Sequence, residues 1–459
     1  MKGGNLMIES WNRKEPFFDS YLIEEMDRNI GHRLGTPQSE GKVLTFEKPW
    51  EGSAVTYCSL IQNGKKAFLY YRGLTTSGHL MTDHDDGQVT CVAVSEDGEH
   101  FERVPMDMFL PEYPGNNVIL KGADAHNFAP FLDTKPGVLP EELYKAVAGE
   151  GEGENHGLKA YYSADGLHWN CPNRKPVITE GQFDSHNIAF YDTEAKVYRC
   201  YCRYWVENGL PTGGFTGIRA ICSVKSPDFV RWTKPEGNIY DRPVTEHFYT
   251  NATVPCPGAE HVLLSFPMRL EPDRMRNPEW PAKGVSDCIF MTSRDGLHWE
   301  RPVRDAFLRA GHDPLCWGDR SQIMTRGLYV HEDGHISMYL DRRYHHSENY
   351  LERLSVRPEG FMSVHGNADG GKILTKPMVF GKGHLMINAS TSAYGSVKIL
   401  VRDAEGNVLP GFGEEGPLWY GDSYREAYRF AGDFSELAGR PVRLEIRLSD
   451  ADIYSIQAC

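Results

Sequence analysis

A seven-residue segment that returns five times along the chain constrains the fold more than any other feature. Its clearest copies are Ser163-Ala-Asp-Gly-Leu-His-Trp169 and Ser293-Arg-Asp-Gly-Leu-His-Trp299. Weaker copies begin at Ser95, Ser226 and Ser355, and in all five an aromatic residue stands six positions after the serine. The serines are 68, 63, 67 and 62 residues apart, and such a regular spacing indicates a repeat architecture. We call each copy a tag.

The residues between the tags indicate β-structure. Apolar runs such as Ala67–Tyr71 and Ile336–Tyr339 follow the hairpin signals Asn63-Gly64 and Asp333-Gly334. A four-stranded unit that cannot bury both of its faces alone closes with its neighbours into a propeller. The sequence therefore predicts an all-β chain that begins with a five-bladed β-propeller. Each tag is expected to form a tight turn at a blade's outer edge, with its aromatic residue packed between blades.

The pattern changes after about Phe361, where the tags end. Residues 372–376, 384–389, 396–401 and 442–448 alternate apolar and polar side chains between Gly-rich turns, which is typical of an antiparallel sandwich. Residues 434–439 are predicted to form a single helical turn. We therefore expect a propeller catalytic domain at residues 1–360, with the N-terminal segment packed on it, and a C-terminal β-sandwich accessory domain at residues 361–459.

Charge and composition exclude several classes of partner. The 459 residues include 63 acidic and 49 basic side chains, a formal net charge of -14, which disfavours nucleic acid. No run of 18 apolar residues indicates a membrane partner, and the N-terminus lacks a secretory signal, so a cytoplasmic protein is predicted. The ten cysteines include no CxxC pair, which argues against a zinc site or a disulfide framework.

Each repeat unit carries one acidic residue near the expected start of its inner strand. The five are Glu51, Asp124, Asp184, Glu246 and Asp319. Because the inner strands of a propeller converge, we expect these carboxylates to share one central funnel. Clustered carboxylates raise one another's pKa, so such an arrangement points to acid/base catalysis or to metal binding. Glycoside cleavage needs one protonated acid and one ionised carboxylate, and a ring of acids supplies that division.

Other side chains near these positions are suited to hold a sugar. Arginines and histidines grip hydroxyl groups, and aromatic rings stack on sugar faces; the candidates are Arg72, Arg203, Arg320, His126, His186, His247, Trp50, Tyr249 and Trp317. For His126 and His186, which precede Asn127 and Asn187, a scaffold role and a substrate contact are both open. No metal or other cofactor is predicted, although the Asp-x-His pairs leave a divalent cation in the channel as an alternative. The run 342–346 either covers the funnel or forms a solvated edge.

The blade count, the Ser-x-Asp-Gly-x-His-Trp tags and the inner-strand carboxylates resemble the five-bladed propeller glycosidases. This is the fold of glycoside hydrolase families 32, 43 and 117, with a terminal sandwich as in the invertase-like members. The resemblance covers residues 44–361 at the level of architecture. The invertase-like motifs Trp-Met-Asn-Asp-Pro-Asn-Gly, Arg-Asp-Pro and Glu-Cys are absent, so the resemblance implies a less characterised family that shares the fold.

The resemblance also implies catalytic roles. Glu246 matches the general acid of a later blade, and Asp124 or Asp184 matches the supporting aspartate of the second. The first blade holds Glu51 where these families hold aspartate, so Asp184 and Glu51 are equal candidates for base or nucleophile. The predicted substrate-binding set is Asp124, His126, Asn127, His186, Asn187, Arg72, Trp50, Trp317, Asp319 and Arg320.

The leading functional hypothesis is an exo-acting glycoside hydrolase of carbohydrate metabolism. Its partner would be a small oligosaccharide, and the sandwich edge leaves a homo-oligomer open. One alternative is a glycoside phosphorylase, because mannoside phosphorylases share this fold; Arg72, Arg203, Arg219 and Arg320 would then form the phosphate site. The other alternative is a non-catalytic carbohydrate-binding propeller.

Overall fold

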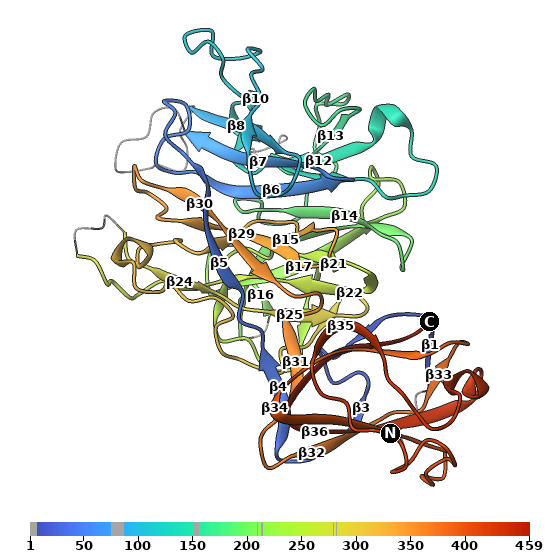
Figure 1. The fold of residues 1–459 in the computed structure, drawn as a ribbon. Helices are drawn as coiled ribbons and strands as arrows, with labels where there is room; N and C mark the ends of the chain where they lie inside the picture. The colour runs from blue at the N-terminus through green and yellow to red at the C-terminus, as the bar shows by residue number, and fades with distance from the viewer. Residues whose placement is uncertain are drawn as a thin grey trace. The chain divides into compact units, whose positions relative to one another are not determined.

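The computed structural model describes residues 7–74, 87–149, 156–208, 210–212, 214–278, 280 and 282–459. Within these ranges the chain is all-β, with strands joined by loops and short 3₁₀ turns (Figure 1). None of the helical segments there has the length and apolarity that a membrane span requires. The chain divides into two compact units. The larger unit holds residues 38–299 and 305–355, and the smaller unit holds residues 1–37, 300–304 and 356–459.

The larger unit contains five antiparallel sheets that follow one another along the chain, here called sheets 1 to 5. Sheet 1 holds β6 (Thr56–Asn63), β7 (Lys66–Leu74), β8 (Gln88–Ser95) and β10 (Val118–Lys121), with β9 (Glu102–Arg103) on β8. Sheet 2 holds β11 (Ala129–Leu132), β12 (Tyr144–Ala148) and β13 (Lys159–Ser163). Sheet 3 holds β14 (Ile188–Asp192), β15 (Val197–Glu207), β17 (Ile218–Ser226) and β18 (Glu236–Gly237), with β16 (Leu210–Pro211) on β15.

Sheets 4 and 5 complete this series. Sheet 4 holds β21 (Val254–Cys256), β22 (Ala259–Ser265) and β25 (Met291–Ser293). Sheet 5 holds β27 (Ile323–Met324), β29 (Ile336–Arg342), β30 (Tyr350–Val356) and β5 (Gln38–Thr45), with β28 (Tyr329–Val330) on β29. Two small additional sheets pair β20 (His247–Phe248) with β23 (Met268–Glu271) and β24 (Val285–Cys288), and β19 (Ile239–Tyr240) with β26 (His298–Trp299).

Sheets 1 and 5 are direct neighbours although they lie at opposite ends of the series. Strand β5 precedes sheet 1 in the sequence but pairs with β30, with Thr45 opposite Tyr350. A parallel bridge also joins Ser59 in β6 to Arg326: the amide of Leu60 donates to the Arg326 carbonyl at 2.7 Å, and the Arg326 amide donates to the Cys58 carbonyl at 2.9 Å. The last sheet of the series therefore lies beside the first.

The tags form the predicted tight turns. In the second tag the Ser163 hydroxyl accepts the Gly166 amide at 2.9 Å, and Asp165 Oδ1 accepts the amides of Leu167 and His168 at 2.8 and 2.9 Å. Gly166 has a φ of 77°, in the left-handed region that glycine adopts without strain. The tags beginning at Ser95 and Ser293 repeat these bonds.

A tyrosine from the preceding sheet docks on three of the tags. The hydroxyls of Tyr70 and Tyr201 donate to the carbonyls of Gly166 and Gly296, each at 2.8 Å, and Tyr339 donates to Gly98. The aromatic residue of each tag packs on the same tyrosine, with ring centroids 6.1 Å apart for Trp169, 5.7 Å for Trp299 and 5.6 Å for Phe101. These three tags therefore join sheet 5 to sheet 1, sheet 1 to sheet 2 and sheet 3 to sheet 4. Such packing of the tag's aromatic residue between neighbouring sheets was predicted from the sequence.

The smaller unit is organised around one long strand, β36 (Pro441–Ala458). It pairs with β34 (Leu385–Arg402), β31 (Met362–Gly366), β32 (Gly371–Thr375), β33 (Met378–Phe380) and β2 (Glu15–Pro16). Further strands extend these: β1 (Ile8–Trp11) on β33, β3 (Ile23–Met26) on β32, β4 (Ile30–Leu34) on β31, and β35 (Asp422–Ala427) on β34. The predicted helical turn is present as Phe434–Leu437.

The N-terminal residues pair within this smaller unit, whereas the sequence prediction packed them on the propeller. Strands β1 to β4 all bond to strands after residue 361. Phe17, Leu22 and Ile30 are buried in the same core as Ile446 and Ile453. The physical reason is that these apolar N-terminal side chains complete a core that residues 361–459 leave open on one side.

Candidate active site

Four arginines and three tyrosines from separate sheets of the larger unit meet in one group, here called the arginine–tyrosine cluster. Its members are Arg72 in β7, Arg203 in β15, Arg219 in β17, Arg320 before β27, Tyr57 in β6, Tyr249 after β20 and Tyr344 after β29. Tyr249 lies at its centre. The guanidinium carbons of Arg203, Arg219 and Arg320 lie 4.2, 5.4 and 5.7 Å from its ring centroid. These are cation–π distances, and they place three positive charges around one phenol.

Hydrogen bonds and ring contacts link the other members. The Arg72 Nη2 donates to the Tyr344 hydroxyl at 2.9 Å, and the Arg72 guanidinium lies 5.0 Å from the Tyr57 ring. The Arg320 Nη1 donates to the Tyr249 hydroxyl at 3.2 Å, and the same guanidinium lies 5.7 Å from the Tyr344 ring. Arg72 of sheet 1 thus contacts Tyr344, which follows β29, and Tyr344 contacts Arg320, which precedes β27. Arg320 in turn contacts Tyr249, which follows β20. The three tyrosines are buried.

Asp184 is one of two predicted carboxylates in contact with this cluster. It lies just before β14, and both of its oxygens accept the Arg203 Nη1 at 2.9 Å. Its neighbour Ser185 donates to the Tyr249 carbonyl at 2.9 Å, and the Arg203 Nη2 donates to the same carbonyl at 3.0 Å. The Asp184 side chain remains 30% exposed, while that of Arg203 is 2% exposed. A buried guanidinium therefore holds a carboxylate that a ligand can reach.

Asp319 aligns a second arginine. Its Oδ2 accepts the Arg320 Nε at 2.6 Å, which orients the guanidinium that donates to Tyr249. Arg320 has a φ of 55°, an unfavourable conformation for a residue with a Cβ. Backbone strain of this kind persists where the surroundings fix a side chain in place, and it is concentrated at functional sites.

The charge balance of the cluster is reflected in its pKa shifts. Burial raises the pKa of Tyr249, but the charges of Arg320 and Arg203 outweigh burial, so the pKa lies below that of an ordinary tyrosine. Burial and the charge of Arg203 lower the pKa of Arg219. Positive charge is therefore in excess around Tyr249, and the cluster is suited to an anion or to a ligand that accepts many hydrogen bonds.

The two predicted histidines border the cluster through Tyr57. The Tyr57 ring centroid lies 5.7 Å from His126 and 5.4 Å from His186. His126 Nδ1 lies 2.9 Å from Gln88 Oε1 and 3.4 Å from the Arg72 Nη1. His186 Nε2 lies 3.0 Å from the Ser59 hydroxyl, and burial together with the charge of Arg326 lowers its pKa to about 3. His186 is consequently a neutral group at physiological pH.

The two asparagines predicted to bind substrate, Asn127 and Asn187, form hydrogen bonds with backbone groups. The side-chain amides of Asn127 and Asn187 donate to the Phe183 carbonyl at 2.6 and 2.9 Å. Asn127 also accepts the Gly149 amide at 3.0 Å. These bonds fix the turn that precedes Asp184, so both asparagines have a scaffold role in the structure.

The other three predicted carboxylates each have a cation of their own. Glu51 is fully buried and accepts the Arg103 Nε and the Tyr71 hydroxyl, both at 2.7 Å. Asp124 accepts the Lys159 Nζ at 2.9 Å. Glu246 accepts the Arg269 Nη1 at 2.9 Å, and that arginine also pairs with Asp287. Glu51, Asp124 and Glu246 thus each pair with a cation that is not a member of the arginine–tyrosine cluster. Asp184 and Asp319 bond to arginines of the cluster.

The predicted tryptophans and the remaining histidine are placed as follows. Trp50 is buried in the core of sheet 1, and its Nε1 donates to Asn117 Oδ1 at 2.7 Å. Trp317 is 38% exposed, and its Nε1 donates to the Gly311 carbonyl at 2.9 Å. His247 Nδ1 lies 3.2 Å from the Arg219 Nη1, which brings His247 to the edge of the cluster.

Sequence reasoning missed Tyr57 and the titratable group of Asp341 beside the cluster. Tyr344 and His345 belong to the run 342–346, which was expected either to cover the funnel or to form a solvated edge, and both side chains are buried. Asp341 is buried in β29, where burial raises its pKa to about 7. The Cys58 thiol donates to its Oδ1 at 3.1 Å. His345 packs on Tyr344 with ring centroids 4.1 Å apart, and burial and the charges of Arg320 and Arg72 lower its pKa to about 3. An acid inside the apolar run of β29 was the available signal for Asp341.

Comparisons with known proteins place glycoside hydrolases among the solved structures that this chain is similar to. No protein-family model matches the sequence, and no curated protein matches it. A structure described as a glycoside hydrolase aligns with 10% identity over 70% of this chain and 92% of its own, with a TM-score of 0.48. A structure described in connection with glycoside hydrolases of the GH130 family of mannoside phosphorylases, which target β-1,2 mannosidic linkages in Candida mannan, aligns with 13% identity over 71% and 95%, with a TM-score of 0.44. A Bacillus subtilis family 43 arabinoxylan arabinofuranohydrolase aligns with 10% identity over 88% and 95%, with a TM-score of 0.38.

Proposed function

We propose that this protein cleaves glycosidic bonds, as a glycoside hydrolase that removes sugars from the ends of small oligosaccharides. Sheets 1 to 5 are then the blades of a five-bladed propeller, and the smaller unit is an accessory β-sandwich. The observation that carries the proposal is the meeting of Asp184, Arg203 and Arg219 of sheet 3 with Tyr249, which follows β20, and Arg320, which precedes β27. A partly exposed carboxylate that is held in place can supply the base or nucleophile of glycoside cleavage, which also needs a second carboxyl group as acid.

Asp184 is the proposed base or nucleophile. Its two oxygens share one guanidinium nitrogen of Arg203, which fixes the carboxylate while leaving it partly exposed. Arg203 in turn lies on the face of Tyr249. Two packed neighbours therefore restrict the position of the reacting group, and such restriction is the source of much catalytic rate enhancement.

Two carboxyl groups are candidates for the general acid. Glu246 is the residue that the family resemblance indicates, but its ion pair with Arg269 stabilises the charged form. Asp341 has a pKa of about 7 because it is buried, which suits proton donation near neutral pH. Glu51 was predicted on equal terms with Asp184 as base or nucleophile, and we assign its carboxylate instead to holding Arg103 and Tyr71 in sheet 1.

The test is kinetic. Asp184→Asn should lower kcat by roughly a thousandfold or more while a sugar ligand still binds. Removal of the true acid, by Glu246→Gln or Asp341→Asn, should abolish turnover of natural glycosides but spare aryl glycosides whose leaving group needs no proton. Glu51→Gln serves as the comparison for a carboxylate outside the cluster. Full activity of Asp184→Asn would contradict the proposal, and sugar binding without turnover by the unmodified protein would support a carbohydrate-binding propeller instead.

The arginine–tyrosine cluster favours glycoside phosphorolysis as a second candidate. Arg203, Arg219 and Arg320 surround Tyr249 beside Asp184, and the Nε atoms of Arg203 and Arg219 are buried without a hydrogen-bond partner among the described residues. Such free N–H groups fit the oxygens of a phosphate dianion. A phosphorylase needs only one protein carboxyl group as acid, since phosphate is the nucleophile.

Phosphate dependence separates the two candidates. A phosphorylase releases a sugar 1-phosphate and has a rate that rises with phosphate concentration, whereas a hydrolase releases the free sugar in phosphate-free buffer. Arg219→Lys keeps the charge but removes the planar pair of donors, and it should raise the KM for phosphate about tenfold or more in a phosphorylase.

A further inference from the structure

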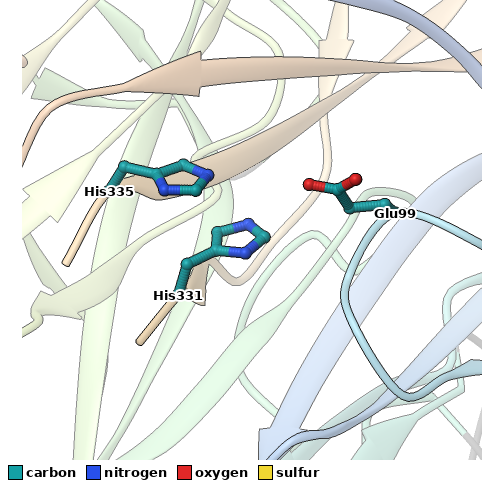
Figure 2. A group of neighbouring side chains, drawn as sticks. All are labelled: Glu99, His331 and His335. Carbon is teal, nitrogen blue, oxygen red and sulfur yellow. The ribbon is translucent and has the colours of Figure 1, made fainter. Parts of the chain in front are cut away.

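We propose that Glu99, His331 and His335 form a binding site for one divalent transition-metal ion, with Zn²⁺ as the representative ligand. One donor atom from each of the three side chains lies within 4.8 Å of the other two. The site shares no residue with the arginine–tyrosine cluster, and the proposal stands independently of the proposed function. Figure 2 shows the Glu99 carboxylate directed toward the two imidazole rings.

The local backbone places the two histidines on one face. They flank the turn between β28 and β29, and the His331 amide donates to the His335 carbonyl at 2.9 Å. Residues opposite one another in a hairpin project their side chains to the same side. The two ring centroids are accordingly 3.8 Å apart, with an angle of 8° between the planes.

Hydrogen bonds fix one nitrogen of each ring and leave the other available. His335 Nδ1 lies 2.5 Å from Asp333 Oδ1, and His331 Nε2 lies 2.7 Å from the Ser337 hydroxyl. Histidines that bind metals in proteins are held in this way, with the second nitrogen bonded to a carboxylate or another oxygen. The set then presents His335 Nε2, His331 Nδ1 and a Glu99 oxygen, and two imidazoles with one carboxylate suit Zn²⁺ and related ions.

The surrounding charges favour a cation. Arg353 Nη2 lies 3.2 Å from Glu99 Oε1 and 3.8 Å from Glu40 Oε2. The carboxylates of Glu99, Glu40 and Asp333 therefore outnumber this one guanidinium. The neighbouring Lys65 is paired with Glu332 at 2.6 Å and adds no net charge. A divalent ion would offset the negative excess at this place.

Binding requires one imidazole to turn. The planes of the two rings are parallel, and a metal ion lies in the plane of each imidazole that binds it. His335 can turn about its Cβ–Cγ bond because its side chain is 27% exposed and that of Asp333 is 68% exposed. The ion would thus separate the stacked pair, and this change provides a spectroscopic signature of binding at these residues.

The position of the site gives the ion a structural role. Glu99 belongs to the tag of sheet 1, and the two histidines belong to the hairpin of sheet 5, where Tyr339 already donates to the Gly98 carbonyl. A metal ion there would cross-link two segments more than 200 residues apart, at the junction where the first and last sheets meet. An ion that binds only the folded chain stabilises it in proportion to its concentration relative to Kd.

The experiment uses the full chain after removal of metals by a chelator. Isothermal titration with Zn²⁺ should give one site per chain, and saturation should raise the Tm. Co²⁺ at the same site should give visible absorption bands, and the ring protons of the stacked histidines should shift in NMR spectra. Glu99→Gln and His335→Ala should each weaken binding by about tenfold or more and remove the rise in Tm.

The matched control is His168→Ala. His168 forms the same Asp-His pair with Asp165 in the tag of sheet 2 as His100 forms with Asp97 in the tag of sheet 1. His168 belongs to no three-ligand group among the described residues. Zn²⁺ binding should be unchanged in this variant. Should His335→Ala fail to fold, the isosteric Glu99→Gln decides the question. Absence of binding by the unmodified chain, or undiminished binding by Glu99→Gln, would overturn the proposal.

Discussion

At Asp341 a carboxyl group is buried beside a thiol and within reach of the charge of Arg72. Burial raises its pKa from 3.8 to about 7, so the folded chain holds a proton there that the unfolded chain has lost above about pH 4. The folded state binds more protons than the unfolded state across this window, and the free energy of unfolding therefore falls as pH rises from about 4 to about 7. Below that window the carboxyl group is neutral in both states.

We predict that Asp341→Asn removes this pH dependence. Relative to the unmodified protein, the variant should gain about 1.4 kcal/mol of stability for each pH unit between about 4 and 7. Urea unfolding at pH 5, 6, 7 and 8, followed by tryptophan fluorescence, measures the difference. A difference that stays constant with pH would show that Asp341 is ionised in the folded protein.

Asp165→Asn is the control for this experiment. Burial opposes ionisation of Asp165, but the His168 amide and ring, with the Leu167 amide, lower its pKa to about 2. The stability that this group contributes is present above the unfolded pKa and is lost only as pH falls toward about 2. In a His168→Ala background, which removes the titratable ring beside Asp165, the cost of Asp165→Asn should therefore be the same at pH 5 and at pH 8.

The sequence located the acidic residues but not which of them act together. Glu51 and Asp184 each precede the first strand of a sheet, β6 and β14 respectively. The difference lies in the exposure of the two ion pairs. The Glu51 side chain that pairs with Arg103 is fully buried, whereas the Asp184 side chain that pairs with Arg203 remains 30% exposed. Arg103 follows Glu51 by 52 residues, and no local pattern shows which of two distant arginines will reach a given carboxylate. Tyr57 was missed for the same reason.

At the scale of the element, the tag turn depends on glycine for two separate reasons. Gly166 has a φ of 77°, and a Cβ there would lie 2.7 Å from the Tyr70 hydroxyl of the preceding sheet. Gly64, in the hairpin between β6 and β7, has a φ of 63° and nothing within 4 Å of the same position. Alanine substitutions at these two glycines can therefore be compared. The Gly64 variant measures the cost of backbone strain alone, and the Gly166 variant adds the cost of a steric clash at the junction between sheets.

We predict that Gly64→Ala costs about 1 kcal/mol, from the left-handed backbone alone. Gly166→Ala should cost about 1–3 kcal/mol more, because the Tyr70 ring must also move. Urea unfolding of both variants measures this difference. In a Tyr70→Phe background, where the hydroxyl is absent, the excess cost of Gly166→Ala should largely disappear. An equal cost for both alanines in the unmodified background would contradict the proposed junction.

Elements with local signals were predicted well from the sequence. The Asp-Gly turns of the tags and the helical turn at Phe434 are confirmed, because their hydrogen bonds lie within a few residues. The pairing of β5 with β30 and the small sheet of β20, β23 and β24 were not predicted. Their partners are distant in sequence or only two to four residues long, and neither case leaves a periodic pattern.

At the scale of the whole molecule, the two ends of the sequence belong to one compact unit. Strands β1 to β4 bond to β31, β32, β33 and β36, so residues 361–459 do not contain all the partners of their own sheet. The predicted boundary at residue 361 located the start of the C-terminal strands but left out these N-terminal ones. Short strands such as Glu15–Pro16 have no recognisable pattern in the sequence.

We predict that residues 361–459 do not fold alone. Ile8, Phe17, Leu22 and Ile30 are buried in this unit, and burial of each contributes about 2 kcal/mol. Their loss amounts to most of the roughly 5–15 kcal/mol by which a domain of this size is stable. A rearranged polypeptide, in which residues 356–459 lead through a flexible Gly/Ser linker into residues 7–37, restores these side chains and the pairing of β1 to β4. It should show a cooperative thermal transition by circular dichroism, and the isolated 361–459 segment should show none. A cooperative transition of the isolated segment at the same temperature would mean that the N-terminal strands add no stability, and that the core of this unit is complete without them.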